Sequence, residues 1–306
     1  MAQRITSAEI EGLCDLATAI ESQRKVFANY YLGNALLGPR AVLSQGENAQ
    51  FAYLARASET GPTIVKFGTV FPNNPKRNLP AVQTSILALS PTNGSVSYEF
   101  DGETVTKLRT VAASMVAIEK LANPPSRVAI VGLGHQGLAH AKALRSIYKP
   151  NSIIGITRDN HTSVSSDVFD NISSNLNDVS DCNLIILATS SSNPVLTEKL
   201  ASGTTCISIG SFSPGRSEVS ERTLKSADLI VVDDPKTSLE QCGSVLNFVN
   251  SSGNELGADF TPRGLGEVLV EGSGRESQSD VICYFSVGLG IQDAAIVEIV
   301  LEKLGS

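Results

Sequence analysis

The sequence predicts an α/β protein of two domains, and three observations lead to this prediction. Its 306 residues exceed what one small core requires and suit two domains, each with its own apolar interior. The first third contains short strand-like runs separated by Gly, Pro and Asn, which is typical of an antiparallel sheet. Beyond Asn123-Pro124-Pro125, helix patterns alternate with continuous apolar strands, which indicates a parallel sheet that is covered on both faces.

The front region is expected to begin and end with a helix. From Ser7 to Ile20, apolar residues recur at helical spacing. Strand-like runs follow beyond Pro39, and residues 91–94, Pro-Thr-Asn-Gly, are a hairpin signal between two of these runs. A second helix is expected over residues 104–121, and the prolines that end it mark the best domain boundary in the sequence.

A glycine-rich loop opens the second region. The stretch VAIVGLGHQG, residues 128–137, lies between a predicted strand and a helix over residues 138–148, the context that a dinucleotide-binding loop requires. One glycine permits the turn, the next lets the backbone approach a pyrophosphate, and the third lets the helix and strand pack closely. The sequence therefore predicts a Rossmann domain whose loop residues contact the coenzyme: Gly132, Gly134, His135, Gln136 and Gly137.

The end of the next strand favours NADP(H) over NAD(H). A carboxylate at this point would bind a ribose hydroxyl, but the sequence reads Thr157-Arg158. The guanidinium of Arg158 suits a 2′-phosphate, which a carboxylate would repel. An alternative stays open, in which Arg158 is a solvated loop charge, Asp159 turns inward to the ribose, and the coenzyme is NAD(H).

Charge and composition exclude several kinds of partner. The net charge is −7 with a sequence pI of about 5.1, and no basic tract is present, which argues against nucleic acid. No apolar run approaches the roughly 20 residues of a membrane span, and the start lacks the layout of a signal peptide. We expect a cytoplasmic protein whose five scattered cysteines are reduced packing residues, with no metal site.

Three cations in the front region are candidates for substrate binding. Arg40 begins a strand, Lys66 lies mid-strand on the same face as Ile64 and Gly68, and Arg109 lies in the first turns of the second helix. By residue type alone, a strand lysine or a helix arginine is usually a solvent-facing charge.

Six segments resemble the ornithine cyclodeaminase and mu-crystallin family, in the family's order and over nearly the whole chain. They are KFGTVFPNNPKRNLPAVQTSILAL, DGETVTKLRTVAASMVAIEKLA, VAIVGLGHQG, ILATSSSNPVL, ISIGSFSPGRSEV and SVGLGIQDAA. The resemblance implies a Rossmann domain, residues 122–292, inserted into a discontinuous α/β substrate and dimerisation domain, residues 1–121 plus 293–306. It also implies a homodimer formed through the substrate-domain sheets.

Motif by motif, the resemblance implies roles for individual residues. Arg40, Lys66 and Arg109 match the positions that contact the substrate carboxylate and the imine. Apart from the resemblance, the reduction needs one proton, for which solvent and Tyr53 are the two candidate donors. An arginine fork suits a planar carboxylate, and an ammonium beside a C=N carbon makes it more electrophilic toward hydride. Coenzyme contacts are implied at the strand ends: Thr189, Ser190, Gly210, Ser211, Val287 and Gly288.

The sequence departs from the cyclodeaminases at two acids. Phe212 stands where they carry an aspartate, and Tyr53 or a neighbour replaces a second acid, so the proton transfers of the full cyclodeaminase cycle lack their groups. We therefore expect an NAD(P)H-dependent reductase of a carboxylate-bearing imine, such as the cyclic Δ1-pyrroline-2-carboxylate or Δ1-piperideine-2-carboxylate. The alternatives are an ornithine or lysine cyclodeaminase, an amino-acid dehydrogenase that uses an open-chain keto acid and amine, and a non-catalytic NADPH-dependent binding protein.

Overall fold

The computed structural model describes residues 2–158, 167–252 and 261–305, which form two compact units. The first unit contains Met1–Ala113 and Leu289–Ser306, and the second contains Ser114–Gly288. We expected the chain to cross between domains near residues 121 and 292, whereas the compact units divide at 113 and 288. The first division lies inside helix α3 (Gly102–Leu121).

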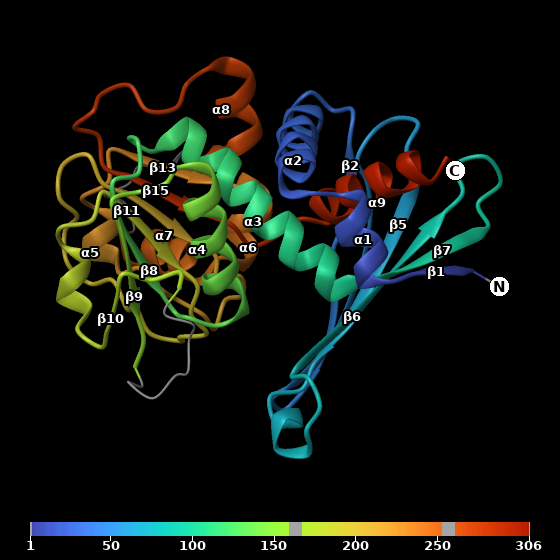
Figure 1. Cartoon of the computed structure of the whole chain (residues 1–306), viewed down its shortest axis with the longest axis horizontal. Coiled ribbons are helices and arrows are strands. Elements are labelled where there is room, and N and C mark those ends of the chain that lie inside the picture. The colour runs from blue at the N-terminus through green and yellow to red at the C-terminus, as the bar shows by residue number, and fades with distance from the viewer. Residues whose placement is uncertain (1, 159–166, 253–260, 306) are drawn as a thin grey trace. The chain divides into compact units, whose positions relative to one another are not determined.

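The first unit is built on a mixed sheet whose strands follow the order β1-β7-β6-β5-β4-β2, with β3 also paired to β4. The pairs from β2 to β7 are antiparallel, and β1 runs parallel to β7. Helix α9 packs against β4, β5 and α2 (Figure 1). The remaining elements of this unit have these bounds: β1 (Gln3–Ile5), β2 (Leu36–Leu37), β3 (Ala41–Gln45), β4 (Asn48–Arg56), β5 (Thr63–Val70), β6 (Val82–Leu89), β7 (Val96–Asp101), α1 (Ser7–Leu13), α2 (Leu16–Tyr31), η1 (Asn74–Arg77) and α9 (Gly290–Leu304).

The expected first helix is two helices. Thr6 and Glu9 form a capping box that starts α1, and the helix ends at Leu13. Asp15 then starts α2, because its carboxylate accepts a hydrogen bond from the backbone N–H of Thr18 at 2.8 Å. The apolar spacing continues across both helices, so periodicity alone does not reveal the break.

The second unit contains an eight-stranded parallel sheet in the order β10-β9-β8-β11-β12-β15-β13-β14. The turn from β8 to α4 carries the glycine loop. The segment around Thr197, between β11 and β12, is irregular apart from a bridge between Leu196 and Val219. The elements are β8 (Arg127–Val131), β9 (Ser152–Ile156), β10 (Asn171–Ser173), β11 (Leu184–Leu187), β12 (Thr205–Ser208), β13 (Leu229–Val232), β14 (Arg263–Gly264), β15 (Ile282–Phe285), α4 (His135–Ile147), η2 (Leu176–Val179), α5 (Glu221–Leu224), α6 (Pro235–Gln241), α7 (Gly243–Ser252) and α8 (Leu265–Glu271).

The predicted fold class is confirmed: an α/β unit with a mostly antiparallel sheet accompanies a Rossmann unit with a parallel sheet. All five cysteines are buried and free. In the part of the chain that the structure describes, no helix combines the length and apolar character of a membrane span, and no three His, Cys, Asp or Glu side chains gather as a metal site.

Candidate active site

Lys66 is a buried cation in the middle of β5. Its side chain is on the same face of the sheet as Ile64, which is also buried, while Phe67 on the opposite face is exposed. The residue directly across the strand pair is Tyr53 of β4. A lysine with only 2% of its surface exposed is unusual, so it requires partners inside the protein.

Those partners come from two helices. The ammonium of Lys66 donates to Thr106 Oγ1 at 2.5 Å and to Asp293 Oδ1 at 2.7 Å. Thr106 lies on α3 and Asp293 on α9, at a sequence distance of 227 residues from Lys66. An ammonium has three N–H groups, and Lys66 has two acceptors among the residues that the structure describes. The third N–H therefore has no acceptor within these residues.

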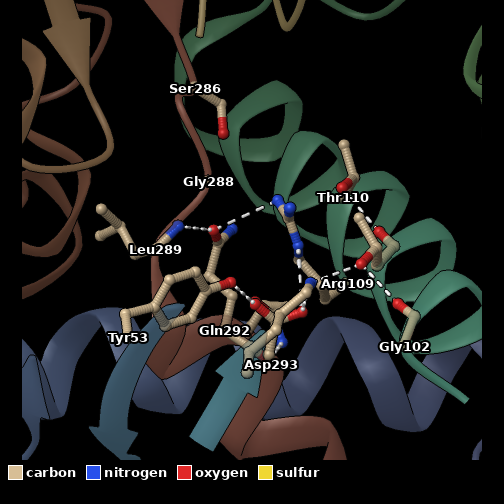
Figure 2. A network of polar contacts seen from close by, with 12 residues as sticks. Tyr53, Gly102, Arg109, Thr110, Ser286, Gly288, Leu289, Gln292 and Asp293 are labelled. Carbon is tan, nitrogen blue, oxygen red and sulfur yellow. Dashed lines mark hydrogen bonds and ion pairs between the residues drawn. The ribbon is translucent and has the colours of Figure 1, made fainter. Parts of the chain in front are cut away.

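Asp293 is the centre of this network (Figure 2). It is fully buried, and its second oxygen accepts a hydrogen bond of 2.8 Å from the Tyr53 hydroxyl. The guanidinium of Arg109 lies 3.6 Å from its first oxygen. One carboxylate therefore faces two buried cations, and these three side chains keep one net positive charge inside the unit.

Arg109 retains unused hydrogen-bond donors. It is 9% exposed, and its Nη1 makes a long contact of 3.4 Å with the Oε1 atom of Gln292. Its buried Nε has no hydrogen-bond acceptor, and the same is true of the Nε2 amide nitrogen of Gln292. Within the described residues, this corner of the site has an excess of donors over acceptors, which is what a bound anion would correct.

The pKa values follow from burial and charge. Burial lowers the pKa of Lys66 from 10.5 to about 8, although the charge of Asp293 opposes this change. Burial would raise the pKa of Asp293, but Lys66 and Arg109 outweigh it, so the pKa lies below its ordinary value. Burial, and then the charge of Asp293, raise the pKa of Tyr53 well above 10. Tyr53 therefore keeps its proton.

Arg40 lies beside this network. Its guanidinium carbon is 5.3 Å from the centre of the Tyr53 ring, within the range of a cation–π contact. Phe51 stacks on the same ring, with the two ring centres 6.2 Å apart. The structure thus brings together the four side chains for which the sequence predicts a catalytic role, Arg40, Tyr53, Lys66 and Arg109, and it adds Asp293.

The glycine loop of the second unit has the shape that a dinucleotide requires. Gly132 has φ +94°, and a Cβ there would approach the carbonyl oxygen of Ala188 to 2.5 Å. A Cβ at Gly137 would lie 1.9 Å from the carbonyl oxygen of Gly132, whereas a Cβ at Gly134 would meet no protein atom within 4 Å. Helix α4 begins at His135 without a side-chain cap, so the first backbone N–H groups of the helix receive no hydrogen bond from a capping side chain. These features fit a pyrophosphate at the helix start.

The other predicted coenzyme residues lie after strands of the same sheet. Thr157 and the exposed Arg158 follow β9, and Asp159, the alternative ribose partner, lies outside the described residues. Thr189 and the exposed Ser190 follow β11, and the buried Gly210 and Ser211 follow β12. These segments therefore meet at the carboxyl edge of the sheet, where such folds bind ligands.

Val287 and Gly288 are held by a buried carboxylate. Asp233, at the end of β13, accepts hydrogen bonds from the backbone N–H groups of Val287 at 2.9 Å and Gly288 at 2.8 Å. The hydroxyl of Ser286 donates to the same oxygen at 3.1 Å. Burial raises the pKa of Asp233, and the hydrogen bonds from Gly288, from the backbone of Asp234 and from Ser286 partly oppose that change.

We expect alanine at Gly134 and at Gly137 to have opposite consequences. Gly137→Ala should destabilise the second unit, because its Cβ would overlap the Gly132 carbonyl. Gly134→Ala should leave the melting temperature within about 2 °C of wild type, because no protein atom is near, yet weaken coenzyme binding by at least about tenfold, because the methyl group enters the pyrophosphate space. Thermal melts and NADH titrations of both variants check this. Unchanged NADH affinity in Gly134→Ala would show that the glycine loop does not contact the coenzyme.

Sequence reasoning missed Asp293 as a site residue and used its position only as a domain boundary. The signal was a carboxylate within the SVGLGIQDAA block that is followed directly by four apolar helix residues, 294–297. Conversely, Phe212, considered there as the replacement for a catalytic aspartate, lies in the second unit, where the Arg216 guanidinium is 4.5 Å from its ring centre.

The fold and these side chains define a class, the two-domain oxidoreductases that use a dinucleotide. The chain belongs to the ornithine cyclodeaminase/mu-crystallin family, whose model matches residues 3–306. It is 30% identical to an alanine dehydrogenase of Archaeoglobus fulgidus, over 98% of this chain and 94% of the relative. It is 26% identical to a Δ1-pyrroline-2-carboxylate reductase of Bacillus cereus, over 78% of this chain and 76% of the relative.

A solved structure agrees with this placement. An archaeal alanine dehydrogenase dimer with bound NAD superimposes with a TM-score of 0.88 and 26% identity, covering 99% of this chain and 95% of that one. The predicted family and the predicted oxidoreductase class are therefore confirmed.

Proposed function

We propose that this protein is an NAD(P)H-dependent reductase of an imine that bears a carboxylate, preferably a cyclic one such as Δ1-pyrroline-2-carboxylate or Δ1-piperideine-2-carboxylate. One observation carries the proposal: the buried cations Lys66 and Arg109 share a single carboxylate and keep unfilled donors. A small anionic substrate supplies the missing charge and acceptors. The relatives named above, one of them called a pyrroline-carboxylate reductase, support the reaction class.

The roles of the cations follow from their geometry. Arg109, together with the neighbouring Arg40, holds the substrate carboxylate, because a guanidinium fork binds a carboxylate through two parallel hydrogen bonds. Lys66 places its free N–H at the imine nitrogen and draws electron density from the C=N carbon. The coenzyme, when bound, supplies the hydride.

Lys66 also supplies the proton. Reduction of a neutral imine adds a hydride to carbon and a proton to nitrogen, which leaves an amine. Tyr53 is a poor donor, because its hydrogen is directed at Asp293 and its pKa lies well above 10. The Lys66 ammonium, with its pKa lowered to about 8, gives up its proton to the nitrogen and regains one from solvent.

This role predicts a pH dependence. The active form of Lys66 is the ammonium, and its pKa of about 8 means that it is charged below pH 8 and loses its proton above it. We expect kcat/KM for imine reduction to fall tenfold per pH unit above pH 8, because the reaction needs one proton at this site. Initial rates measured from pH 6 to 10 check this. A profile that stays flat to pH 10 contradicts it.

The coenzyme is a nicotinamide dinucleotide, and Arg158 favours its phosphorylated form. We expect Arg158→Ala to raise the KM for NADPH by about tenfold or more, because a charge-assisted contact to the 2′-phosphate is lost, while leaving the KM for NADH unchanged. The control is Arg222→Ala, which removes another exposed arginine of the same unit, paired with Glu198 at 3.1 Å. If wild type prefers NADH, the assignment of Arg158 is wrong.

A second candidate is an alanine dehydrogenase, which the 30% identical relative favours because the alignment covers almost the entire chain. Both reactions pass through an imine with a carboxylate, and they differ in whether the nitrogen is already attached. A dehydrogenase requires free ammonia and a keto acid. A cyclodeaminase is less favoured, because Asp293 is ionised and held by two cations rather than available as a general base.

The deciding experiment follows NADPH and NADH consumption with Δ1-pyrroline-2-carboxylate, Δ1-piperideine-2-carboxylate, and pyruvate with and without ammonia. If NADPH or NADH is oxidised with the cyclic imines but not with pyruvate, the protein is the proposed reductase. If the coenzyme is oxidised only with pyruvate plus ammonia, the protein is the dehydrogenase. Ammonia release from ornithine or lysine would identify a cyclodeaminase, and tight coenzyme binding without turnover of any substrate would identify a binding protein.

A homodimer formed through the sheet of the first unit is also proposed. Leu54 and Phe67 lie on the face of the sheet opposite to Lys66 and are 52% and 44% exposed. Large exposed apolar side chains on one sheet face are typical of a protein interface. The related archaeal structure is described as a dimer.

A further inference from the structure

Glu218 is a buried acid of the second unit that the proposed reaction does not use. It lies between β12 and α5, and none of its surface is exposed. Its carboxylate accepts four hydrogen bonds. Oε1 accepts from the backbone N–H of Thr189 at 2.6 Å and from its hydroxyl at 2.8 Å, and Oε2 accepts from the Ser208 hydroxyl and the Gly210 N–H, both at 2.7 Å.

These donors belong to the ends of two neighbouring parallel strands. Thr189 follows β11, Ser208 ends β12, and Gly210 lies two residues further on. Each oxygen has two donors, so the carboxylate is fully satisfied as an anion. Burial raises the pKa of Glu218, and the four donors oppose that rise. If the carboxyl were protonated, its hydrogen would point at one of these N–H or O–H donors. The hydrogen-bond pattern therefore favours the ionised form.

Thr189 connects Glu218 with the glycine loop. A Cβ placed on Gly132 would lie 3.2 Å from the Thr189 methyl group, so Thr189 lines the point where β8 and β11 diverge. The strands β9 and β10 continue from β8 on one side, and β12 continues from β11 on the other, so the strand order reverses here. Dinucleotides bind at such a reversal.

The contact with Gly210 is equally close. A Cβ at Gly210 would lie 2.4 Å from Glu218 Oε1 and 2.2 Å from the Thr189 carbonyl oxygen, so no larger residue fits. The backbone N–H of Glu218 itself donates to Ser211 Oγ and Ser244 Oγ, both at 3.1 Å. Side chain and backbone of this one residue thus hold both strand-end segments that are predicted to contact the coenzyme.

We propose that Glu218 is a positioning residue of the coenzyme site, which fixes Thr189 and the Gly210–Ser211 segment in the arrangement that binds the dinucleotide. This inference rests on the proposed function in one respect, namely that a nicotinamide dinucleotide binds at this edge of the sheet. Glu218 itself acts indirectly, because its hydrogen bonds described above hold the segments that bind the coenzyme.

The test is Glu218→Gln, whose amide NH2 group replaces one acceptor oxygen and opposes two donors. The dissociation constant of NADH and of NADPH is measured by fluorescence titration of the purified protein without imine. We expect the coenzyme constant to rise by about tenfold or more, since hydrogen bonds to a charged group are lost. The KM for the coenzyme should rise with it, while the KM for the imine stays within about twofold, because the cation site lies in the other unit.

Two further variants make the test decisive. Glu267→Gln removes a partly exposed carboxylate that caps α8 in the same unit, and it should bind coenzyme like wild type. Should Glu218→Gln fail to fold, Ser208→Ala removes one of the four donors and should still raise the coenzyme constant by about threefold or more. Unchanged coenzyme affinity in the tested variant overturns the proposal, as does a parallel rise in the coenzyme and imine KM with a lowered melting temperature. If wild type itself binds no nicotinamide dinucleotide, the proposed function fails instead.

Discussion

Replacement of Lys66 by methionine is expected to lower kcat/KM for imine reduction by about 10³-fold, within the range attributed to general acid catalysis and electrostatic stabilisation. Methionine retains much of the volume of the buried side chain but has no charge and no N–H group. The variant therefore loses both the polarisation of the C=N bond and the proton donor. Steady-state kinetics with the best imine and coenzyme of wild type measure the effect.

The matched control is Lys107→Met, which removes an exposed lysine of α3 that pairs with Glu11 at 2.8 Å. Its kcat/KM should stay within about twofold of wild type, since surface ion pairs contribute little. Titration with NADH separates binding from chemistry, and Lys66→Met should retain the wild-type coenzyme affinity. Equal catalytic rates for Lys66→Met and wild type would exclude Lys66 from the mechanism.

The second large effect is expected for Asp293→Asn, on both stability and pH dependence. The substitution leaves Lys66 and Arg109 buried without their anion, and breaking a buried pair in this way costs about 3–5 kcal/mol of unfolding free energy. It also removes the charge that raises the pKa of Lys66, so burial and Arg109 then lower that pKa below 8. The decline of kcat/KM should therefore begin at a lower pH than in wild type.

Urea unfolding and the pH profile are measured side by side on Asp293→Asn and on Glu302→Gln, which removes an exposed acid from the same helix. The control should match wild type in both. Tyr53→Phe provides a milder change, because it removes the hydroxyl contact to Asp293 while both ion pairs remain. A pH profile of Asp293→Asn that coincides with wild type would mean that Asp293 does not set the charge of Lys66.

Features encoded in short stretches of the sequence were predicted correctly. The glycine loop is recognisable because its strand, turn and helix are consecutive, and the structure has a glycine at φ +94° in that turn. The face of β5 that carries Lys66 follows from strand alternation, and the burial of Ile64 and exposure of Phe67 agree with it. The antiparallel and parallel sheets likewise follow from local strand patterns.

The family resemblance correctly indicated that Arg40, Lys66 and Arg109 lie close together, but other contacts between distant residues were not predicted. Asp293 looks like an ordinary acid in the first turn of a helix, and its role depends on Lys66, which is 227 residues away. Strand β15 pairs with β12 and β13 although it follows both in the sequence, so no local pattern indicates its position. Glu218 is similar, because a buried carboxylate with four donors cannot be distinguished in the sequence from a solvated one.

The origin of Asp293 in α9 has a consequence for biosynthesis. A ribosome delivers the strands that carry Tyr53 and Lys66 long before it delivers α9, and domains tend to fold in the order in which they emerge. Until the last helix arrives, the nascent first unit holds a lysine and an arginine whose countercharge has not been made. Early compaction of that unit is then electrostatically opposed, and α9 brings both part of the core and the carboxylate that pairs with Lys66 and Arg109.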